Sequence, residues 1–145
     1  MKQQDSTTNL MNVLKTTDKE DINLYSRNYL ASQFSGFSAY MDSIINEKNL
    51  KRQDIFQKAD LPQKFGYKLL SGETHTINRD KLLRIFIAMN MNLKETHRAL
   101  KLYGMAPLYP KVKRDAIIII AINKEVSCVD TINEWLIEYG EAELS

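Results

Sequence analysis

Histidine and cysteine, the side chains that most often serve as nucleophile, general base or metal ligand, are few in this chain. They are His75, His97 and Cys128. Neither histidine has a partner at zinc-site spacing, and Cys128 has no histidine or cysteine near it. The sequence also lacks a glycine-rich phosphate loop and a recognisable nucleophile. We therefore expect no catalytic residue, no metal and no cofactor. We interpret the protein as a non-enzyme and Cys128 as a buried residue.

Charge is distributed unevenly, although the net charge of the chain is only +2. The segment 48–68 is basic, and every charged residue after Lys124 is acidic. A basic patch beside an acidic half suits a surface that faces DNA. On charge alone, a solvated helix face explains the pattern as well.

The chain of 145 residues has the length of one domain, or of a small domain with an attached module. No segment approaches the roughly 18 apolar residues of a membrane span. The first ten residues lack the apolar core of a secretion signal. A single cysteine fits a reducing compartment. We therefore expect a cytoplasmic protein that does not enter a membrane.

Apolar residues recur at helical spacing in consecutive short segments, and no strand pattern interrupts them. The spacing predicts helices over 37–49, 51–59, 62–71, 78–90 and 92–104. Asn78 and Asn92 are predicted to cap two of these helices, and Gly72 and Gly104 are predicted to end two. This part of the chain should form an all-α domain.

Two further helices are predicted nearer the end of the chain. The segment "KRDAIIIIAINK" favours a strand by propensity, but no partner strand is in sight and Asp115 suits a first helical turn. We predict a buried helix there. The pattern Ser127-x-x-Asp130 is predicted to cap the last helix, which ends at Gly140. Residues 105–145 would form a module for dimerisation or for binding a partner or effector.

The first 35 residues are polar and are predicted to be a partly helical extension, with helices near 8–15 and 18–31. The chain then divides into this extension, a domain over 36–104 and the module over 105–145.

The segment "LKRQDIFQKADLPQKFGYKLLSGE", residues 50–73, resembles the lambda-repressor-like (Xre) helix-turn-helix family. The resemblance extends from about Phe37 to Tyr103. It rests on a frame of apolar, small and helix-ending positions: Ile55, Ala59, Leu61, Leu69, Ser71 and Gly72. It implies a five-helix DNA-binding domain whose helix 62–71 enters the major groove, in a homodimer on a two-fold operator.

The resemblance also assigns roles to individual side chains. The residues expected at base edges are Gln63, Lys64 and Tyr67. The residues expected near phosphates are Arg52, Gln53, Lys68 and Thr74. Glutamine can form two hydrogen bonds with adenine, and lysine can donate to guanine. Phosphate contacts fix the register on the duplex without reading its sequence.

Three residues depart from the family pattern. Asp60 replaces a turn glycine, and aspartate tolerates the left-handed conformation better than most residues. Phe56 stands where the family prefers alanine, and Gly66 stands where it prefers valine or isoleucine. Because the two positions face each other, we infer that the Phe56 ring fills the space over Gly66. The alternative is a loosened motif that no longer binds DNA.

The sequence is also compatible with two other functions. The chain could be an adaptor or antitoxin-like protein that binds a protein partner through Phe65, Tyr67 and the C-terminal helices. It could also be a ligand sensor in which residues 111–145 form the effector module.

Overall fold

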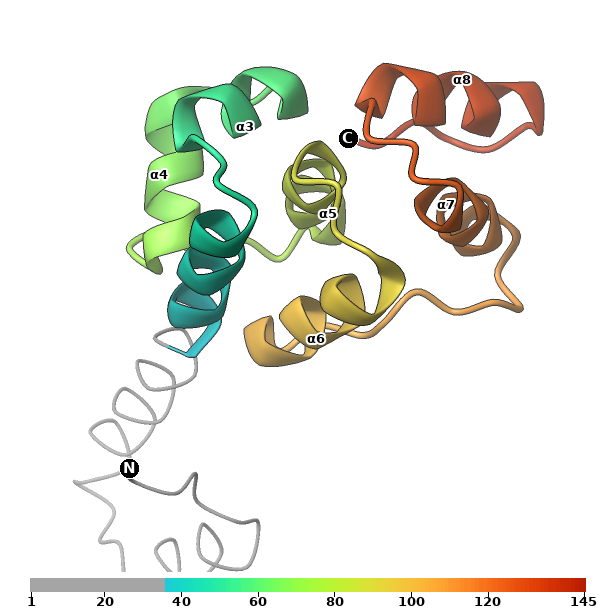
Figure 1. Ribbon diagram of the computed structural model, residues 1–145. Helices are drawn as coiled ribbons and strands as arrows, with labels where there is room; N and C mark the ends of the chain where they lie inside the picture. The colour runs from blue at the N-terminus through green and yellow to red at the C-terminus, as the bar shows by residue number, and fades with distance from the viewer. Residues whose placement is uncertain (1–35) are drawn as a thin grey trace, which may run out of the picture. The chain divides into compact units, whose positions relative to one another are not determined.

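The computed structural model describes residues 36–145, which belong to one compact unit, Gln33–Ser145 (Figure 1). These residues form helices and no strand, so the predicted all-α class is confirmed for them. The helices predicted within 1–35 lie outside the described residues. The helices are 36–47, α3 (Arg52–Ala59), α4 (Gln63–Ser71), α5 (Arg79–Ala88), α6 (Leu93–Tyr103), α7 (Lys113–Asn123) and α8 (Val129–Glu138).

Both predicted asparagine caps are present. The Asn78 side chain accepts a hydrogen bond from the backbone N–H of Asp80 at 3.0 Å. At the start of α6, Asn92 and Glu95 form a capping box: each side chain accepts from the backbone N–H of the other residue, at 2.8 and 2.9 Å. Such caps satisfy backbone donors that a helix leaves unpaired, and each contributes about 1 kcal/mol.

Three helices end where the sequence predicts. Gly72 and Gly104 follow α4 and α6 with φ of 82° and 87°, the left-handed region that glycine occupies without steric cost. Asp60 ends α3 with φ of 55°, so this aspartate adopts the left-handed conformation expected at the turn. These ends fix the short connections that orient one helix against the next.

Helix α5 is the centre of the packing. It contacts α3, α6 and α8, and in Figure 1 it lies between them. Its predicted core residues are all buried: Leu82, Leu83, Ile85, Phe86 and Met89. The rings of Phe86 and Tyr103 both lie against the ring of Phe37, at centroid distances of 6.4 and 4.8 Å, which ties helix 36–47 to α5 and α6.

The isoleucine-rich segment is a helix, as predicted, but it is buried on one side only. Ile118 and Ile122 face the core, whereas Ile120 is 50% exposed. Helix α7 packs against α6 and α8, and α8 packs against α5. The two C-terminal helices therefore pack back on the preceding helices.

The start of α8 differs from the prediction. The N-cap residue is Cys128, not Ser127, and its side chain makes no capping hydrogen bond. Cys128 is also exposed, so its predicted burial is wrong. Burial of Val129, Ile132 and Leu136 on one face sets the rotation of the helix, and Cys128 falls at its exposed margin.

Two neighbouring ion pairs join the N-terminal ends of α5 and α7. Arg79 of α5 pairs with buried Asp115 of α7, with Nη2 and Oδ1 2.5 Å apart. In the opposite direction, Arg114 of α7 pairs with Asp80 of α5 through two hydrogen bonds of 2.8 and 3.1 Å. The Asp115 carboxylate also accepts from the backbone N–H of Tyr109 at 2.9 Å. Each carboxylate is thus satisfied by a guanidinium of the other helix.

The last residues of the chain join this polar network. Arg84 of α5 donates to the carbonyl oxygens of Leu144 and Ser145, and also to that of Ala59 at the end of α3. The Asn133 side chain accepts from the backbone N–H of Leu144 at 2.8 Å. Arg84 therefore links the end of α3 directly to residues 144–145.

The Asp80 carboxylate gives the fold a defined pH dependence. Burial acts to raise the pKa of Asp80, but hydrogen bonds from Arg114 and Ser145 outweigh burial and hold the pKa below its ordinary value. Its stabilisation is complete above about pH 4, the unfolded-state pKa, and is lost as the pH falls through the lower folded-state pKa. The free energy of unfolding of the Asp80→Asn variant should be about 1–3 kcal/mol lower than that of the wild type at pH 7. Below about pH 4, the free energy of unfolding of this variant should fall less steeply with pH than that of the wild type.

Urea unfolding at a series of pH values measures this effect. Asp54→Asn is the matched control, because Asp54 is exposed and forms no ion pair within residues 36–145. Equal acid sensitivity of the Asp80→Asn variant and the wild type would contradict the assignment.

Candidate nucleic-acid interface

Helices α3 and α4 are joined by the short connection 60–62. The backbone N–H of Leu61 donates to the carbonyl of Phe56 at 3.0 Å, and the buried Leu61 side chain anchors the turn. Pro62 is the N-cap residue of α4, and its carbonyl accepts from the N–H of Gly66 at 3.0 Å. The second helix therefore begins immediately after the turn.

The predicted packing of Phe56 over Gly66 is confirmed. The Phe56 side chain is fully buried, and α4 continues without a break through Gly66. A Cβ atom added to Gly66 would lie 2.6 Å from Cε1 and 2.7 Å from Cγ of the Phe56 ring. Contacts under 3.0 Å are essentially never seen for real Cβ atoms, so a side chain at position 66 and the Phe56 ring exclude each other.

Sequence reasoning missed a second contact of this ring. Tyr67 packs edge-on against Phe56, with ring centroids 5.0 Å apart and an interplanar angle of 70°. The Tyr67 ring remains 45% exposed. Its position next to Gly66 is the available sequence signal, since a ring that fills the space over one residue also reaches the next.

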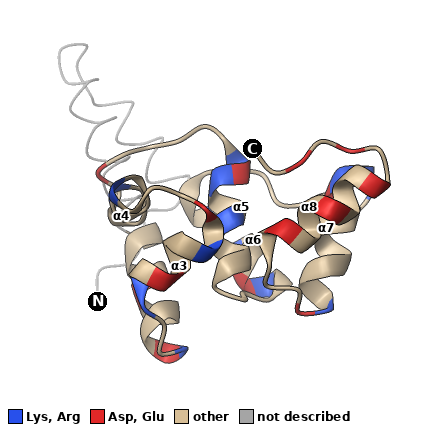
Figure 2. Ribbon diagram, turned by 90° about the horizontal axis from the view of Figure 1, so that it is seen from above, with Lys and Arg blue, Asp and Glu red and all other residues tan. Residues whose placement is uncertain are grey.

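The residues expected at base edges lie together on the outer face of α4. Gln63, Lys64 and Tyr67 are exposed and Lys68 is partly exposed, at spacings that place them on one side of a helix. Within residues 36–145, neither lysine forms an ion pair. Figure 2 shows basic segments and no acidic segment on α4 itself, whereas α3 carries both signs.

The expected phosphate contacts on α3 are arranged less freely. Gln53 is exposed, but the Arg52 guanidinium pairs with the carboxylate of Asp42 from helix 36–47. Part of the positive charge of Arg52 is therefore neutralised within the chain. Sequence reasoning missed this pair, because the helical pattern does not show which polar side chains of two helices meet.

Thr74 lies in the loop that follows α4. Its backbone N–H donates to the carbonyl of Lys68 at 3.1 Å, which ties the loop to the last turn of α4. The Thr76 N–H donates to the Tyr103 hydroxyl at 2.8 Å, and the His75 ring stacks on the Tyr103 ring at 5.2 Å. Burial raises the pKa of the Tyr103 phenol above its ordinary value. The loop is thus held by α6.

Comparisons with protein-family models, with curated proteins and with solved structures found no match for this chain. Over residues 36–145, no helix is long and apolar enough to cross a membrane. The same residues contain no cluster of three or more histidine, cysteine or carboxylate side chains that could hold a metal ion.

The Phe56–Gly66 contact predicts a characteristic mutational pattern. Phe56→Ala should leave a cavity and cost about 3–5 kcal/mol. Gly66→Ile should destabilise the wild type, because its side chain would overlap the Phe56 ring. In the double variant, the isoleucine should fill the cavity and recover part of the loss. Chemical unfolding of all four proteins measures the coupling between the two positions, and strictly additive effects would contradict it.

Proposed function

We propose that this protein is a sequence-specific DNA-binding transcriptional regulator of the lambda-repressor-like (Xre) type. In this proposal, residues 36–104 are the DNA-binding domain and helix 62–71 reads the major groove. The protein acts in the cytoplasm as a homodimer on double-stranded DNA, without a metal, a cofactor or an enzymatic activity. The observation that carries the proposal is the close packing of α4 on α3, which turns Gln63, Lys64 and Lys68 outward on one face, around the ring of Tyr67.

The residues on this face match the chemistry of base edges. An α-helix fits the major groove, where the four base pairs present different donors and acceptors. Gln63 stands in the first turn of α4, and its side-chain amide can accept from adenine N6 through the oxygen and donate to N7 through the NH2, while Lys64 can donate to guanine. The Tyr67 ring, held edge-on by Phe56, supplies an apolar surface for a thymine methyl group or a sugar.

Phosphate contacts would fix this helix in the groove. Lys68 adds charge at the last turn of α4, and Gln53 lies exposed at the first turn of α3. The loop residue Thr74 adds a polar group beside α4. Arg52 would share its guanidinium between Asp42 and a phosphate, so its contribution is weaker than that of an unpaired arginine. These contacts are independent of sequence and sensitive to salt.

One observation favours a second candidate function, an adaptor or antitoxin-like protein. Tyr67 places a half-exposed aromatic ring in the middle of the outer face, and aromatic side chains are enriched in protein interfaces. In that case Phe65, Tyr67 and the C-terminal helices would contact a protein partner, and the basic residues would be a solvated rim.

Two substitutions on the same face separate base reading from phosphate contact. Gln63→Ala should cost about 1–3 kcal/mol on the preferred duplex only, with relaxed choice at one base pair per half-site. Lys68→Ala should weaken binding to preferred and random duplexes by the same factor, and should reduce the salt slope by roughly one. The preferred duplex is obtained by selection from a random pool with the purified protein, and binding is titrated at several salt concentrations.

Lys101→Ala is the matched control, because Lys101 is an exposed lysine on α6, a helix that carries none of the expected DNA contacts. It should leave the preference and the salt slope unchanged. If the wild type prefers no duplex over random DNA, the regulator proposal fails. If Gln63→Ala and Lys68→Ala also leave the residual binding unchanged, the adaptor function takes its place.

A further inference from the structure

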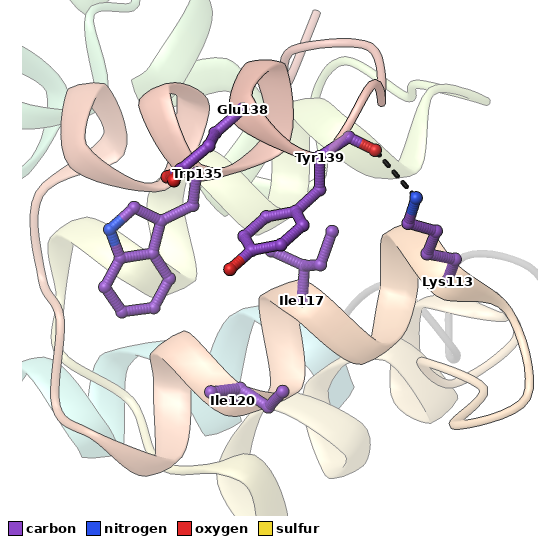
Figure 3. A pocket seen from close by; sticks show the side chains of 6 residues that line it. All are labelled: Lys113, Ile117, Ile120, Trp135, Glu138 and Tyr139. Atoms are coloured by element: carbon purple, nitrogen blue, oxygen red, sulfur yellow. Dashed lines mark hydrogen bonds between the residues drawn. The ribbon is translucent and has the colours of Figure 1, made fainter.

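An apolar groove opens between α7 and α8, with a volume of about 450 Å³ (Figure 3). In Figure 3, Trp135 and Tyr139 of α8 lie across the groove from Ile117 and Ile120 of α7. Lys113 closes one end, where its Nζ donates to the carbonyl oxygen of Tyr139 at 2.8 Å. The residues that line the groove are Lys113, Ile117, Ile120, Trp135, Glu138 and Tyr139.

Helix α7 is apolar on more sides than its packing uses. The segment 116–122 contains only alanine and isoleucine, and a helix that is apolar all round is usually buried all round. Helix α7 packs against α6 and α8, yet Ile120 is 50% exposed and Tyr139 across the groove is 56% exposed. This side of α7 is therefore accessible to a further apolar surface.

The charged residues at the groove indicate what kind of partner could cover it. Lys113 of α7 and Glu138 of α8 are both exposed, and neither takes part in an ion pair within residues 36–145. A two-fold contact uses the same patch on both copies, so the patch must carry its own complement. Lys113 and Glu138, one basic and one acidic residue beside the apolar residues of the groove, meet this requirement.

We propose that a second copy of this chain occupies the groove in a two-fold dimer. Ile120 and Trp135 of the two copies form its apolar centre, and Lys113 of each copy faces Glu138 of the other. Large side chains such as tryptophan, buried at the middle of an interface, contribute most of its binding energy. The paired charges would set the register.

Other occupants fit these features less well. A nucleic acid would meet the acidic side of α8, which carries Asp130, Glu134 and Glu138. A small ligand is normally enclosed over most of its surface, whereas Ile120 and Tyr139, on opposite walls of this groove, are half exposed.

The inference rests on the proposed function in one respect, since a two-fold operator calls for a dimer. It also leaves the proposed DNA-reading residues free, because the groove is built from α7 and α8 and the reading face from α4. The two proposals can still be tested apart, because the oligomeric state is measurable without DNA.

The first test measures the molar mass of the full chain by light scattering and sedimentation, without DNA. The wild type should be a dimer at micromolar concentration. Ile120→Glu places a charge in the apolar centre and should raise the dissociation constant of the dimer about 100-fold or more. Ile137→Glu is the matched control: Ile137 is 57% exposed on the same helix pair but does not line the groove, so this variant should remain a dimer. Circular dichroism verifies that both variants are folded.

The second test reverses the charges of Lys113 and Glu138. Lys113→Glu and Glu138→Lys should each weaken self-association by roughly 10-fold, because each creates two like-charge contacts in the dimer. An equimolar mixture of the two variants should regain the wild-type affinity, since both contacts then pair opposite charges. The double variant in one chain should regain it as well.

Three outcomes would overturn the inference: a monomeric wild type, a dimer that Ile120→Glu leaves intact, or a mixture that does not recover. A monomeric wild type would leave the groove to a partner protein or ligand. If monomeric Ile120→Glu still prefers the selected duplex, with weaker affinity, both proposals stand. If the wild type is a dimer of the expected kind but prefers no duplex, only the regulator proposal fails.

Discussion

The reciprocal exchange of arginine and aspartate between α5 and α7 holds these two helices together. The dipeptide Arg79-Asp80 begins α5 and the dipeptide Arg114-Asp115 lies in the first turn of α7, and each arginine pairs with the aspartate of the other helix. Both carboxylates are buried, so each would be costly without its partner. A carboxylate in the first helical turn also suits the helix dipole. The exchange therefore fixes α7 against α5 in one register.

Polar contacts also connect this pair of helices to α3, the helix that precedes α4. Asp80 accepts hydrogen bonds from Arg114 and from the backbone N–H of Ser145, and Arg84 one turn later binds the carbonyls of residues 144 and 145. The same guanidinium donates to the carbonyl of Ala59 at 3.0 Å, immediately before the turn into α4. A chain of hydrogen bonds thus leads from Arg114 of α7 through Asp80 and Arg84 of α5 to Ala59 at the end of α3.

Local features of this fold could be predicted from the sequence, while contacts between distant polar residues could not. The caps Asn78 and Asn92 depend on residues two or three positions away, so spacing alone predicts them. The Phe56–Gly66 contact was predicted because the resemblance of residues 50–73 to a known helix-turn-helix pattern implies that the two positions face each other. In contrast, the partners Asp80 and Arg114 are 34 residues apart, and no periodicity connects them. The predicted start of α8 was wrong, because burial of Val129 outweighed the capping preference of Ser127.

The exchange of volume between Phe56 and Gly66 has a consequence for the outer face of α4. A ring in place of a small residue on α3 would push α4 away, unless α4 gives up its own side chain at the contact. With glycine at position 66 the helices stay close, and the ring extends far enough to support Tyr67. If this face binds DNA as proposed, a ring supported in this way would lose little further freedom, whereas the flexible side chains of Gln63 and Lys64 would still have to be ordered. The same packing that preserves the helix pair therefore gives its polar face one preorganised aromatic contact.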